Sequence, residues 1–343
     1  MKFQKNTKRY CFLLTVLLLA TLLALPAAAA RPTLTVGGVP FGVRFVTDGV
    51  MVVGYCNVRC GGKEQSPARE AGLRPGDCIC GVEGQAVNTA EDLQKAIEQN
   101  GKRAISISYT REGQEATATL TPLPCDEDGR LRLGLYVRDA GAGIGTVTFV
   151  EEDGRFGGLG HGICDGECGA LIPLARGSVM GVTVGEISRG AAGAPGELRG
   201  HFSPKRVGVL QQNTTCGVFG ALTERPCGLG QTLPIAYRNE VHDGAATLRC
   251  TLDESGPREY TVELSAIHRD ADGNKCFTVK VTDPALLAKT GGIIQGMSGS
   301  PLVQDGRLVG AVTHVMINDP TTGYGIFIEN MLSAAQMPRE RAS

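Results

Sequence analysis

The sequence predicts a mainly β protein, and three observations lead to this prediction. Glycine is abundant, with 48 of the 343 residues, whereas tryptophan is absent. Short runs rich in valine, isoleucine and threonine recur along the chain with glycine-containing turns between them, as in strands joined by tight connections. Stretches with the periodicity of long helices are few. A chain of this length holds one to three domains.

Charge and composition indicate a globular protein and argue against nucleic-acid binding. The formal net charge is −1 at pH 7, and apolar residues make up 42% of the chain, which is normal for a globular protein. No run of lysine and arginine occurs beyond the N-terminus, so we expect no nucleic-acid partner.

The first 30 residues predict a targeting segment. Basic residues precede an apolar stretch from Cys11 to Leu25, and Pro26 with four alanines follows it. This order is typical of a secretory signal. The apolar part has about 15 residues, fewer than the roughly 20 of a spanning helix, so a cleaved signal peptide and a retained membrane anchor are both open. Either one places the remaining chain outside the cytoplasm.

The cysteines leave two possibilities open. The chain has 12 cysteines, and 11 remain if Cys11 leaves with a signal peptide. Export permits disulfides, and an odd number leaves one thiol free. Two groups lie close in sequence, but their spacings differ from the Cys-x2-Cys pairs of common zinc sites: Cys56, Cys60, Cys78 and Cys80, then Cys164 and Cys168. We therefore favour free or paired cysteines over a metal site, and we expect no cofactor.

Residues 31–125 form the first predicted domain. Ser66-Pro67-Ala68 begins a short helical turn, and the Arg-Pro-Gly-Asp sequence at 74–77 is a turn before a strand. Thr89 is placed to cap a helix that runs to Asn100, with Asp92 at the capping-box position. Strands over 104–109 and 116–120 complete the unit.

These motifs resemble a PDZ domain, the peptide-binding module of many exported proteases. PDZ domains accept a peptide C-terminus or strand beside a carboxylate-binding loop. The resemblance implies that Phe41, Gly42 and Val43 form this loop, because they show an apolar-Gly-apolar pattern after Pro40. An ordinary strand start is the alternative.

Residues 126–343 form the second predicted domain, after a polar, proline-containing linker over 121–130. Its short strand candidates, spread over about 210 residues, predict two β-barrel lobes. The candidates are 143–150, 179–187, 207–210, 247–252, 260–264 and 276–281.

The strongest functional motif is the sequence Gly-Met-Ser-Gly-Ser-Pro at 296–301. Two strands joined by an Asp-Gly turn at 305–306 follow it. This combination resembles the nucleophile loop and cleft-lining hairpin of chymotrypsin-like serine peptidases. The resemblance implies Ser298 as the nucleophile and the N–H groups of Gly296 and Ser298 as the oxyanion hole. It also implies that the second strand, with Thr313, His314 and Val315, lies beside substrate. A glycine- and serine-rich turn without chemistry is the alternative.

A serine nucleophile needs a base and a group that orients the base. Among the five histidines, His161 is the best candidate, because it follows a strand and stands between two glycines well before the serine. For the acid, Asp283 ends an apolar strand 15 residues before Ser298. It also precedes Pro284, which is a strong helix-capping pattern. Asp165 is the competing acid.

The chain resembles the stage IV sporulation peptidase B family of endospore-forming bacteria. The residues that carry this resemblance are Leu-Tyr-Val-Arg-Asp at 135–139, Gly-Ile-Gly-Thr at 143–146, Leu-Gly-His-Gly-Ile at 159–163, Lys-Val-Thr-Asp-Pro at 280–284, the long block 290–315, and the segments 318–320 and 323–325. The resemblance implies a triad of Ser298, His161 and Asp283. Met297 departs from the digestive peptidases, which carry an Asp there that pairs with a newly freed N-terminus.

Members of this family are regulatory endopeptidases, so the resemblance implies that role here. They are exported into the space between the two forespore membranes and cleave themselves. They then cut the regulator of a membrane-embedded metalloprotease that processes pro-sigma-K. Two other functions remain open at this stage: a non-catalytic PDZ adaptor, and an envelope quality-control protease.

Overall fold

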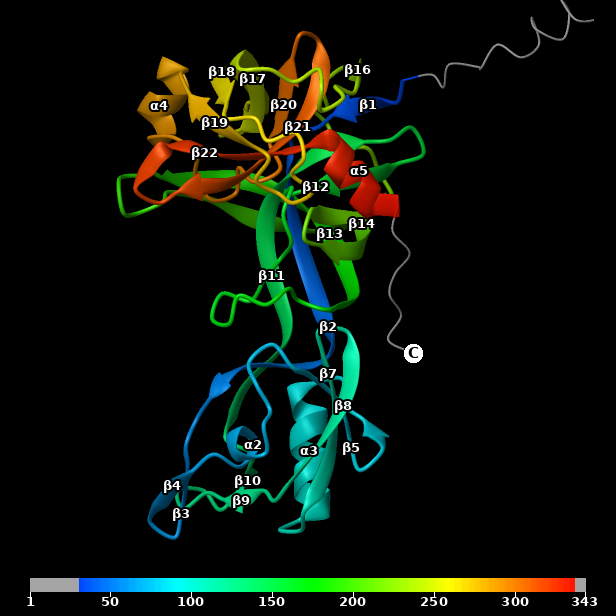
Figure 1. Cartoon of the computed structure of the whole chain (residues 1–343), viewed down its shortest axis with the longest axis vertical. Helices are drawn as coiled ribbons and strands as arrows, with labels where there is room; N and C mark the ends of the chain where they lie inside the picture. Colours follow the sequence, from blue (N-terminus) through cyan, green and yellow to red (C-terminus); the bar gives the residue numbers. More distant parts are fainter. Residues whose placement is uncertain (1–30, 337–343) are drawn as a thin grey trace, which may run out of the picture. The chain divides into compact units, whose positions relative to one another are not determined.

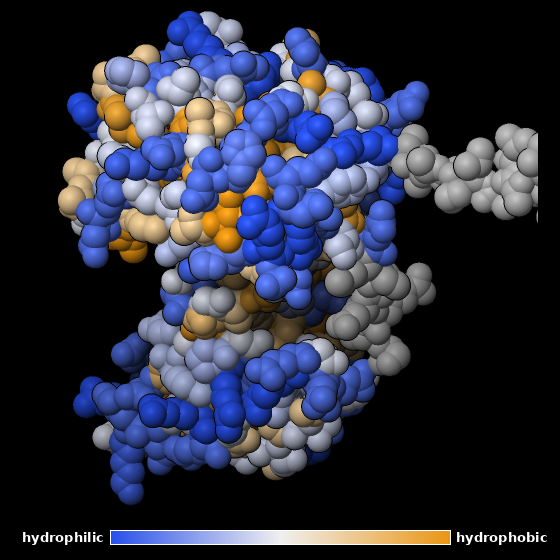
Figure 2. Space-filling view, turned by 45° about the horizontal axis from the view of Figure 1, so that its top comes forward, coloured by the Kyte–Doolittle hydropathy of each residue, from blue (hydrophilic) through white to orange (hydrophobic). Residues whose placement is uncertain are grey.

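The computed structural model describes residues 31–336, and the targeting segment predicted over 1–30 lies outside them. Within the described range, no helix has the length and apolar character needed to cross a membrane. Strands dominate, as Figure 1 shows, and the predicted mainly β fold is confirmed. On the face shown in Figure 2 hydrophilic residues predominate, and apolar ones form small patches.

The first barrel is a ring of six antiparallel strands. The ring runs through β11 (Leu135–Val150), β12 (Arg155–Gly158), β15 (Gly217–Leu222), β14 (Glu197–Thr214), β13 (Leu174–Ser188) and β2 (Pro40–Tyr55). The pairing of β2 with β11 closes the ring. At its side β1 (Thr33–Val36) pairs with β11 and with β16 (Thr232–Pro234).

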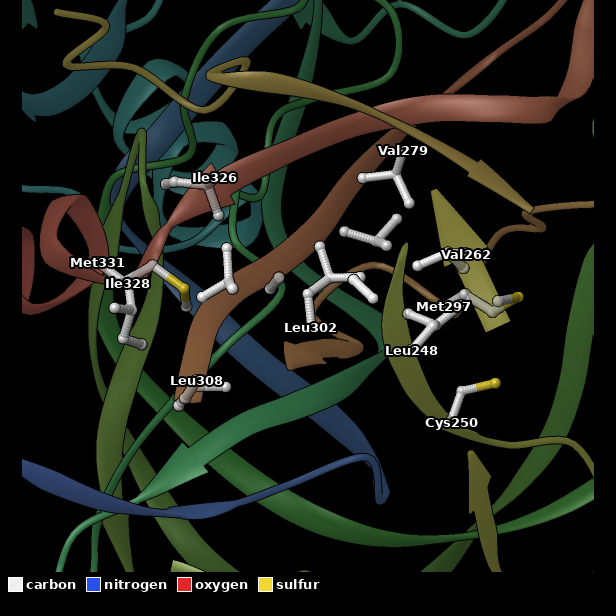
Figure 3. Packing of buried hydrophobic residues seen from close by; sticks show 14 of the residues in the cluster. Leu248, Cys250, Val262, Val279, Met297, Leu302, Leu308, Ile326, Ile328 and Met331 are labelled. Atoms are coloured by element: carbon white, nitrogen blue, oxygen red, sulfur yellow. The ribbon is translucent and has the colours of Figure 1, made fainter. Parts of the chain in front are cut away.

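The second barrel is also closed. It consists of β17 (Gly244–Thr251), β18 (Pro257–Ser265), β19 (Phe277–Val281), β22 (Asp319–Phe327), β21 (Arg307–Met316) and β20 (Pro301–Gln304). Alternate residues of these strands point inward and form an apolar core (Figure 3), which includes Leu248, Val262, Val279 and Leu302. Helix α4 (Pro284–Thr290) leads from β19 to the serine loop, and α5 (Ile328–Gln336) follows β22. The two predicted β-barrel lobes are therefore present.

The smaller unit near the N-terminus has its own core, built around α3 (Ala90–Asn100). As predicted, Thr89 and Asp92 form a reciprocal capping box, and Gly101 ends the helix with a positive φ of 68°. The unit also contains β3 (Val58–Cys60), β4 (Lys63–Gln65), α2 (Pro67–Glu70), β5 (Cys78–Val82), β6 (Gln85–Ala86), β7 (Ile105–Arg111), β8 (Gln114–Leu120), β9 (Leu123–Pro124) and β10 (Leu131–Arg132). Strand β5 pairs with β2 at Val50 and Met51.

The prediction that Phe41, Gly42 and Val43 form the carboxylate-binding loop of the PDZ domain is wrong. These residues lie in the first half of β2, where Phe41 pairs with Gly145 of β11 on one edge and with Gly181 of β13 on the other. With both edges paired, no peptide strand can be added there. Phe41 and Val43 are 2% exposed and belong to the core of the first barrel. The structure thus assigns residues 33–46 to the peptidase barrel, although the sequence placed them in the first domain.

Candidate active site

Ser298 lies in the loop between α4 and β20, and two glycines shape this loop. Gly296 and Gly299 have φ values of 96° and 93°, a region that side-chain-bearing residues rarely adopt. A Cβ atom on Gly299 would lie 2.1 Å from the carbonyl oxygen of Thr146. Glycine is therefore required at position 299 both by conformation and by space.

Strand β11 holds the serine loop by donating hydrogen bonds to the carbonyl groups of the loop. The Thr146 N–H donates to the Ser298 carbonyl at 3.0 Å, and the Thr146 hydroxyl donates to the Gly296 carbonyl at 2.8 Å. The Thr148 hydroxyl donates to the Gly299 carbonyl at 2.7 Å. Sequence reasoning missed both threonines, although polar residues two apart in an otherwise apolar strand were a signal for a shared face.

The same arrangement leaves two N–H groups free. Among the hydrogen bonds of residues 31–336, neither the Gly296 N–H nor the Ser298 N–H is a donor. These are the two groups predicted for the oxyanion hole, and an acyl-transfer site needs such unspent donors beside its nucleophile. Met297, between them, is 1% exposed and points into the second barrel's core beside Leu248 and Val262 (Figure 3). Apolar burial therefore anchors the loop at the position where digestive peptidases carry an aspartate.

The hydroxyl of Ser298 is half-buried and faces β21. Its Oγ donates to the Thr313 carbonyl at 2.7 Å. Thr313 is itself fixed, because its hydroxyl lies 2.8 Å from the Asn274 carbonyl and 3.2 Å from the Tyr324 carbonyl. The predicted substrate strand, with Thr313, His314 and Val315, therefore lies beside the predicted nucleophile. Its role toward substrate stays a prediction.

A tight turn brings His161 to the same place. Leu159 and Gly160 both have positive φ values, and a Cβ on Gly160 would lie 2.9 Å from a methyl group of Thr313. The imidazole rings of His161 and His314 lie with their centroids 4.8 Å apart and their planes at 35°. The histidine predicted as the base and the histidine predicted beside substrate are thus in direct contact.

The tautomer of His161 follows from its hydrogen bond. Its Nδ1 lies 2.8 Å from the carbonyl oxygen of Gly162. A carbonyl can only accept, so Nδ1 carries the proton and Nε2 of the neutral ring holds a free electron pair. This is the tautomer that a general base requires.

Burial keeps both imidazoles neutral. It lowers the pKa of His161, and the Gly162 carbonyl opposes this shift in part. Burial also lowers the pKa of His314 to about 4, with smaller contributions from His161 and from the Lys275 ammonium. Near pH 7 the site therefore contains two uncharged rings, one of them ready to accept a proton.

The structure does not bring Asp283 to His161. One oxygen of Asp283 accepts the N–H groups of Ala285 and Leu286 at the start of α4, and the other accepts the Thr261 N–H at 3.3 Å. These contacts match the helix-capping alternative. The acid role implied by the resemblance stays a prediction, and it would require the carboxylate to leave these donors.

Asp165, the competing acid, is also occupied elsewhere. Its Oδ1 accepts the N–H groups of Glu167 and Cys168, and its Oδ2 pairs with Arg138 at 3.1 Å. Within the described part of the chain, no ion pair or hydrogen bond joins a carboxylate to His161 or His314. The hydrogen bond that orients the His161 ring goes to the carbonyl of Gly162.

The smaller unit contains a separate groove. A hollow of about 270 Å³ lies between α3 and the segment 130–137. Its lining includes Leu133-Gly134-Leu135. This segment has the same apolar-Gly-apolar pattern that led us to predict the carboxylate-binding loop at Phe41–Val43. The lining of the hollow consists mainly of apolar residues, together with two arginines: Cys56, Ala90, Leu93, Gln94, Ile97, Arg130, Arg132, Leu133, Gly134, Leu135, Tyr136 and Val137.

The cysteines form no cross-links in the described range. All 11 cysteines from Cys56 to Cys276 are free thiols. No group of three or more potential metal-binding side chains occurs among residues 31–336.

Family comparisons match both parts of the chain. The model of the family described as SpoIVB peptidase S55 matches residues 129–332, and a PDZ domain model matches residues 58–111. Curated relatives match over shorter segments. Mitochondrial serine protease HTRA2 of Bos taurus is 46% identical over 59 residues, which are 17% of this chain and 12% of that protein. A protein of Treponema pallidum (strain Nichols) named as a zinc metalloprotease is 36% identical over 73 residues, 21% of this chain and 16% of that protein. This chain thus spans about a sixth or less of the length of these relatives.

Solved structures give weaker similarity. The Rv3671c protease from M. tuberculosis, in its active form, aligns with 15% identity and a TM-score of 0.31 over 58% of this chain and 76% of that chain. The PDZ domain of the SdrC-like protein from Listeria monocytogenes aligns with 22% identity and a TM-score of 0.22 over 26% of this chain and 87% of that chain.

Proposed function

The chain belongs to the SpoIVB peptidase S55 family and is a serine peptidase with a PDZ domain; from this premise we propose that Ser298 is its nucleophile and His161 its general base. The observation that supports this assignment most is the serine loop held by Thr146 and Thr148. Its free Gly296 and Ser298 N–H groups lie beside a half-buried hydroxyl. A glycine-rich turn without chemistry has no need of these features.

The proposed reaction follows the general acyl-transfer scheme. The Ser298 hydroxyl turns from the Thr313 carbonyl toward His161, whose Nε2 accepts the proton as Oγ attacks the scissile carbonyl carbon. The N–H groups of Gly296 and Ser298 then bind the oxyanion. His161 returns the proton to the leaving amine, and water repeats the sequence to release the acyl group.

In this scheme the Gly162 carbonyl takes the orienting role that a carboxylate has in a triad. It fixes Nδ1–H and stabilises the imidazolium as a hydrogen-bond acceptor, without a negative charge. Asp283 caps α4 in the arrangement described here.

We also propose the biological role that the family implies: an exported regulatory endopeptidase that cleaves itself and then acts close to a membrane. Its proposed substrate is the regulator of the metalloprotease that processes pro-sigma-K during sporulation. The predicted targeting segment and the PDZ unit, which lies in the chain between strands β2 and β11 of the peptidase barrel, support this proposal. The groove beside α3 is the proposed site for a peptide C-terminus or strand of the partner.

One incubation tests the catalytic assignment. Purified protein should cleave itself and react with a fluorophosphonate probe, and Ser298→Ala should lose both activities while keeping its fold. Loss of a triad-type nucleophile removes most of the rate and leaves only residual catalysis. Mass spectrometry of the products and in-gel detection of the probe provide the measurements.

Ser300→Ala is the matched control. The Ser300 hydroxyl is buried without a hydrogen-bond partner within the described range, so its removal should change little. An inactive Ser300→Ala with an active Ser298→Ala would reverse the assignment. Absence of labelling in the wild type would favour the non-catalytic adaptor.

A further inference from the structure

His314 has features that lining a substrate cleft does not explain. It lies on β21, directly after the residue whose carbonyl accepts the Ser298 hydroxyl. Its ring contacts the ring of His161, with 4.8 Å between centroids. Its Nδ1 is buried and has no hydrogen-bond partner among residues 31–336. An unpaired buried nitrogen is costly, and a native protein usually keeps one for a reason.

The groups around His161 and His314 favour the uncharged form of both imidazole rings. From the segment before β19, the Lys275 ammonium lies over the Tyr324 ring at 5.1 Å and acts on His314. From the His161 loop, the carboxylate of Asp165, four residues further along the chain, pairs with Arg138. The groups that face His314 are therefore a neutral imidazole and a cation. Protonation of His314 would place a second positive charge beside the Lys275 ammonium.

We propose that His314 is a positioning residue for the His161 base. Its neutral ring covers one face of His161, excludes water from it, and keeps Nδ1–H directed at the Gly162 carbonyl. When Ser298 is deprotonated, the proton moves from Oγ to Nε2 of His161, and the resulting imidazolium lies against the π-face of the uncharged His314 ring. No proton passes to His314. The proposal rests on the proposed function of Ser298 and His161.

The first test reads the His161 ring directly and needs no turnover. It uses full-length protein with Ser298→Ala, so that self-cleavage is absent, and follows the ring nitrogens by ¹⁵N NMR through a pH titration. We expect the Nδ1–H tautomer and a His161 pKa below its ordinary value of about 6.5. Adding His314→Ala should raise this pKa toward 6.5, because water then reaches the exposed ring face. Adding His314→Phe should keep it low, because phenylalanine still covers that face.

The second test measures turnover of a peptide substrate against pH. His314→Ala should lower kcat about 10- to 100-fold, a part of the roughly 10²- to 10⁴-fold contribution of a general base. KM should change less than about threefold, and the acidic limb of kcat/KM should move to higher pH. His314→Phe should stay within about tenfold of the wild type. His201→Ala, an exposed histidine on β14, is the control and should leave both the limb and kcat unchanged.

Two results would overturn the proposal: an unchanged His161 titration in His314→Ala, or a change in KM alone, which would leave only a substrate contact. Should His314→Ala fail to fold, His314→Gln also removes the ring and carries the same expectations. Failure of the proposed function looks different, because the wild type would not react with a fluorophosphonate while the NMR titration would still report on the histidine pair.

Discussion

At the scale of single residues, the site depends on backbone groups as much as on side chains. A main-chain carbonyl, that of Gly162, accepts the hydrogen bond from His161, the proposed base. Another, that of Thr313, accepts the hydroxyl of Ser298, the proposed nucleophile. The N–H groups of Gly296 and Ser298 are the proposed donors to the oxyanion. A sequence motif cannot predict such roles, because residues of any type supply the same backbone atoms.

Asp283 is the residue for which the family resemblance and the observed contacts predict different results. On these contacts, Asp283→Asn should keep most of the wild-type kcat, because asparagine caps a helix about as well as aspartate. Asp283→Ala should lose about 1 kcal/mol of stability through the lost cap. Steady-state kinetics and urea denaturation of both variants provide the measurements.

The opposite result has an equally definite meaning. A fall of roughly 10⁴-fold in kcat for Asp283→Asn, with an unchanged denaturation midpoint, would establish the triad acid that the resemblance implies. It would also mean that the carboxylate exchanges its capping contacts for His161 during turnover.

At the scale of elements, local patterns were predictable and long-range partners were not. The capping box of α3, the Asp-Gly turn between β20 and β21, and the glycines of the serine loop each follow from neighbouring residues. Phe41–Val43 matched a PDZ loop just as well locally. Its actual partners at Gly145 and Gly181 lie more than 100 positions away, where sequence pattern carries no pairing information. For the same reason Ser298 and His161 were found as motifs, but the contact between His161 and His314 was not.

Strand β11 holds the serine loop, and one substitution can test whether this contact matters for catalysis as well as for stability. Thr146→Val removes the bond to the Gly296 carbonyl and keeps the shape of the side chain. We expect a loss of about 1 kcal/mol in stability. The looser loop should also lower kcat about tenfold with little change in KM, because misplaced oxyanion donors weaken transition-state binding.

Thr35→Val is the matched control for this variant. The Thr35 hydroxyl is also buried and bonds to Thr232 at 3.0 Å, but it lies on β1 away from the serine loop. A similar loss of stability with unchanged kcat is expected there. Equal kcat losses in both variants would show that β11 has no special role at the site.

At the scale of the whole molecule, the half-buried pair of His161 and His314 links stability to pH. An unfolded chain protonates its histidines below about pH 6.5. The folded chain resists, because the pKa of His161 is lowered and that of His314 is about 4. The stability that this pair contributes is thus complete above pH 6.5 and is lost as the pH falls toward 4.

This linkage can be measured by urea denaturation of the Ser298→Ala protein at pH 7.5 and pH 5. The free energy of unfolding should be lower at pH 5. Adding His314→Phe should shrink the difference between the two pH values by on the order of 1 kcal/mol, a figure discounted because the His314 ring is only half-buried. An undiminished difference would show that His314 does not titrate as described.

Strand β2 belongs to the first barrel and also pairs with β5 of the smaller unit, and its early place in the chain affects when the peptidase fold can form. Phe41 in β2 pairs with Gly181 in β13, 140 positions later, and the ring of six strands also needs β15 before it closes. During synthesis, the leading strand must therefore wait for most of the peptidase chain to emerge, and such distant pairings form slowly. Ser298, the proposed nucleophile, is synthesised later still. If it is the nucleophile, proteolysis within one molecule can begin only after synthesis has passed residue 298 and both barrels have closed, so the order of the strands sets the earliest time of activity.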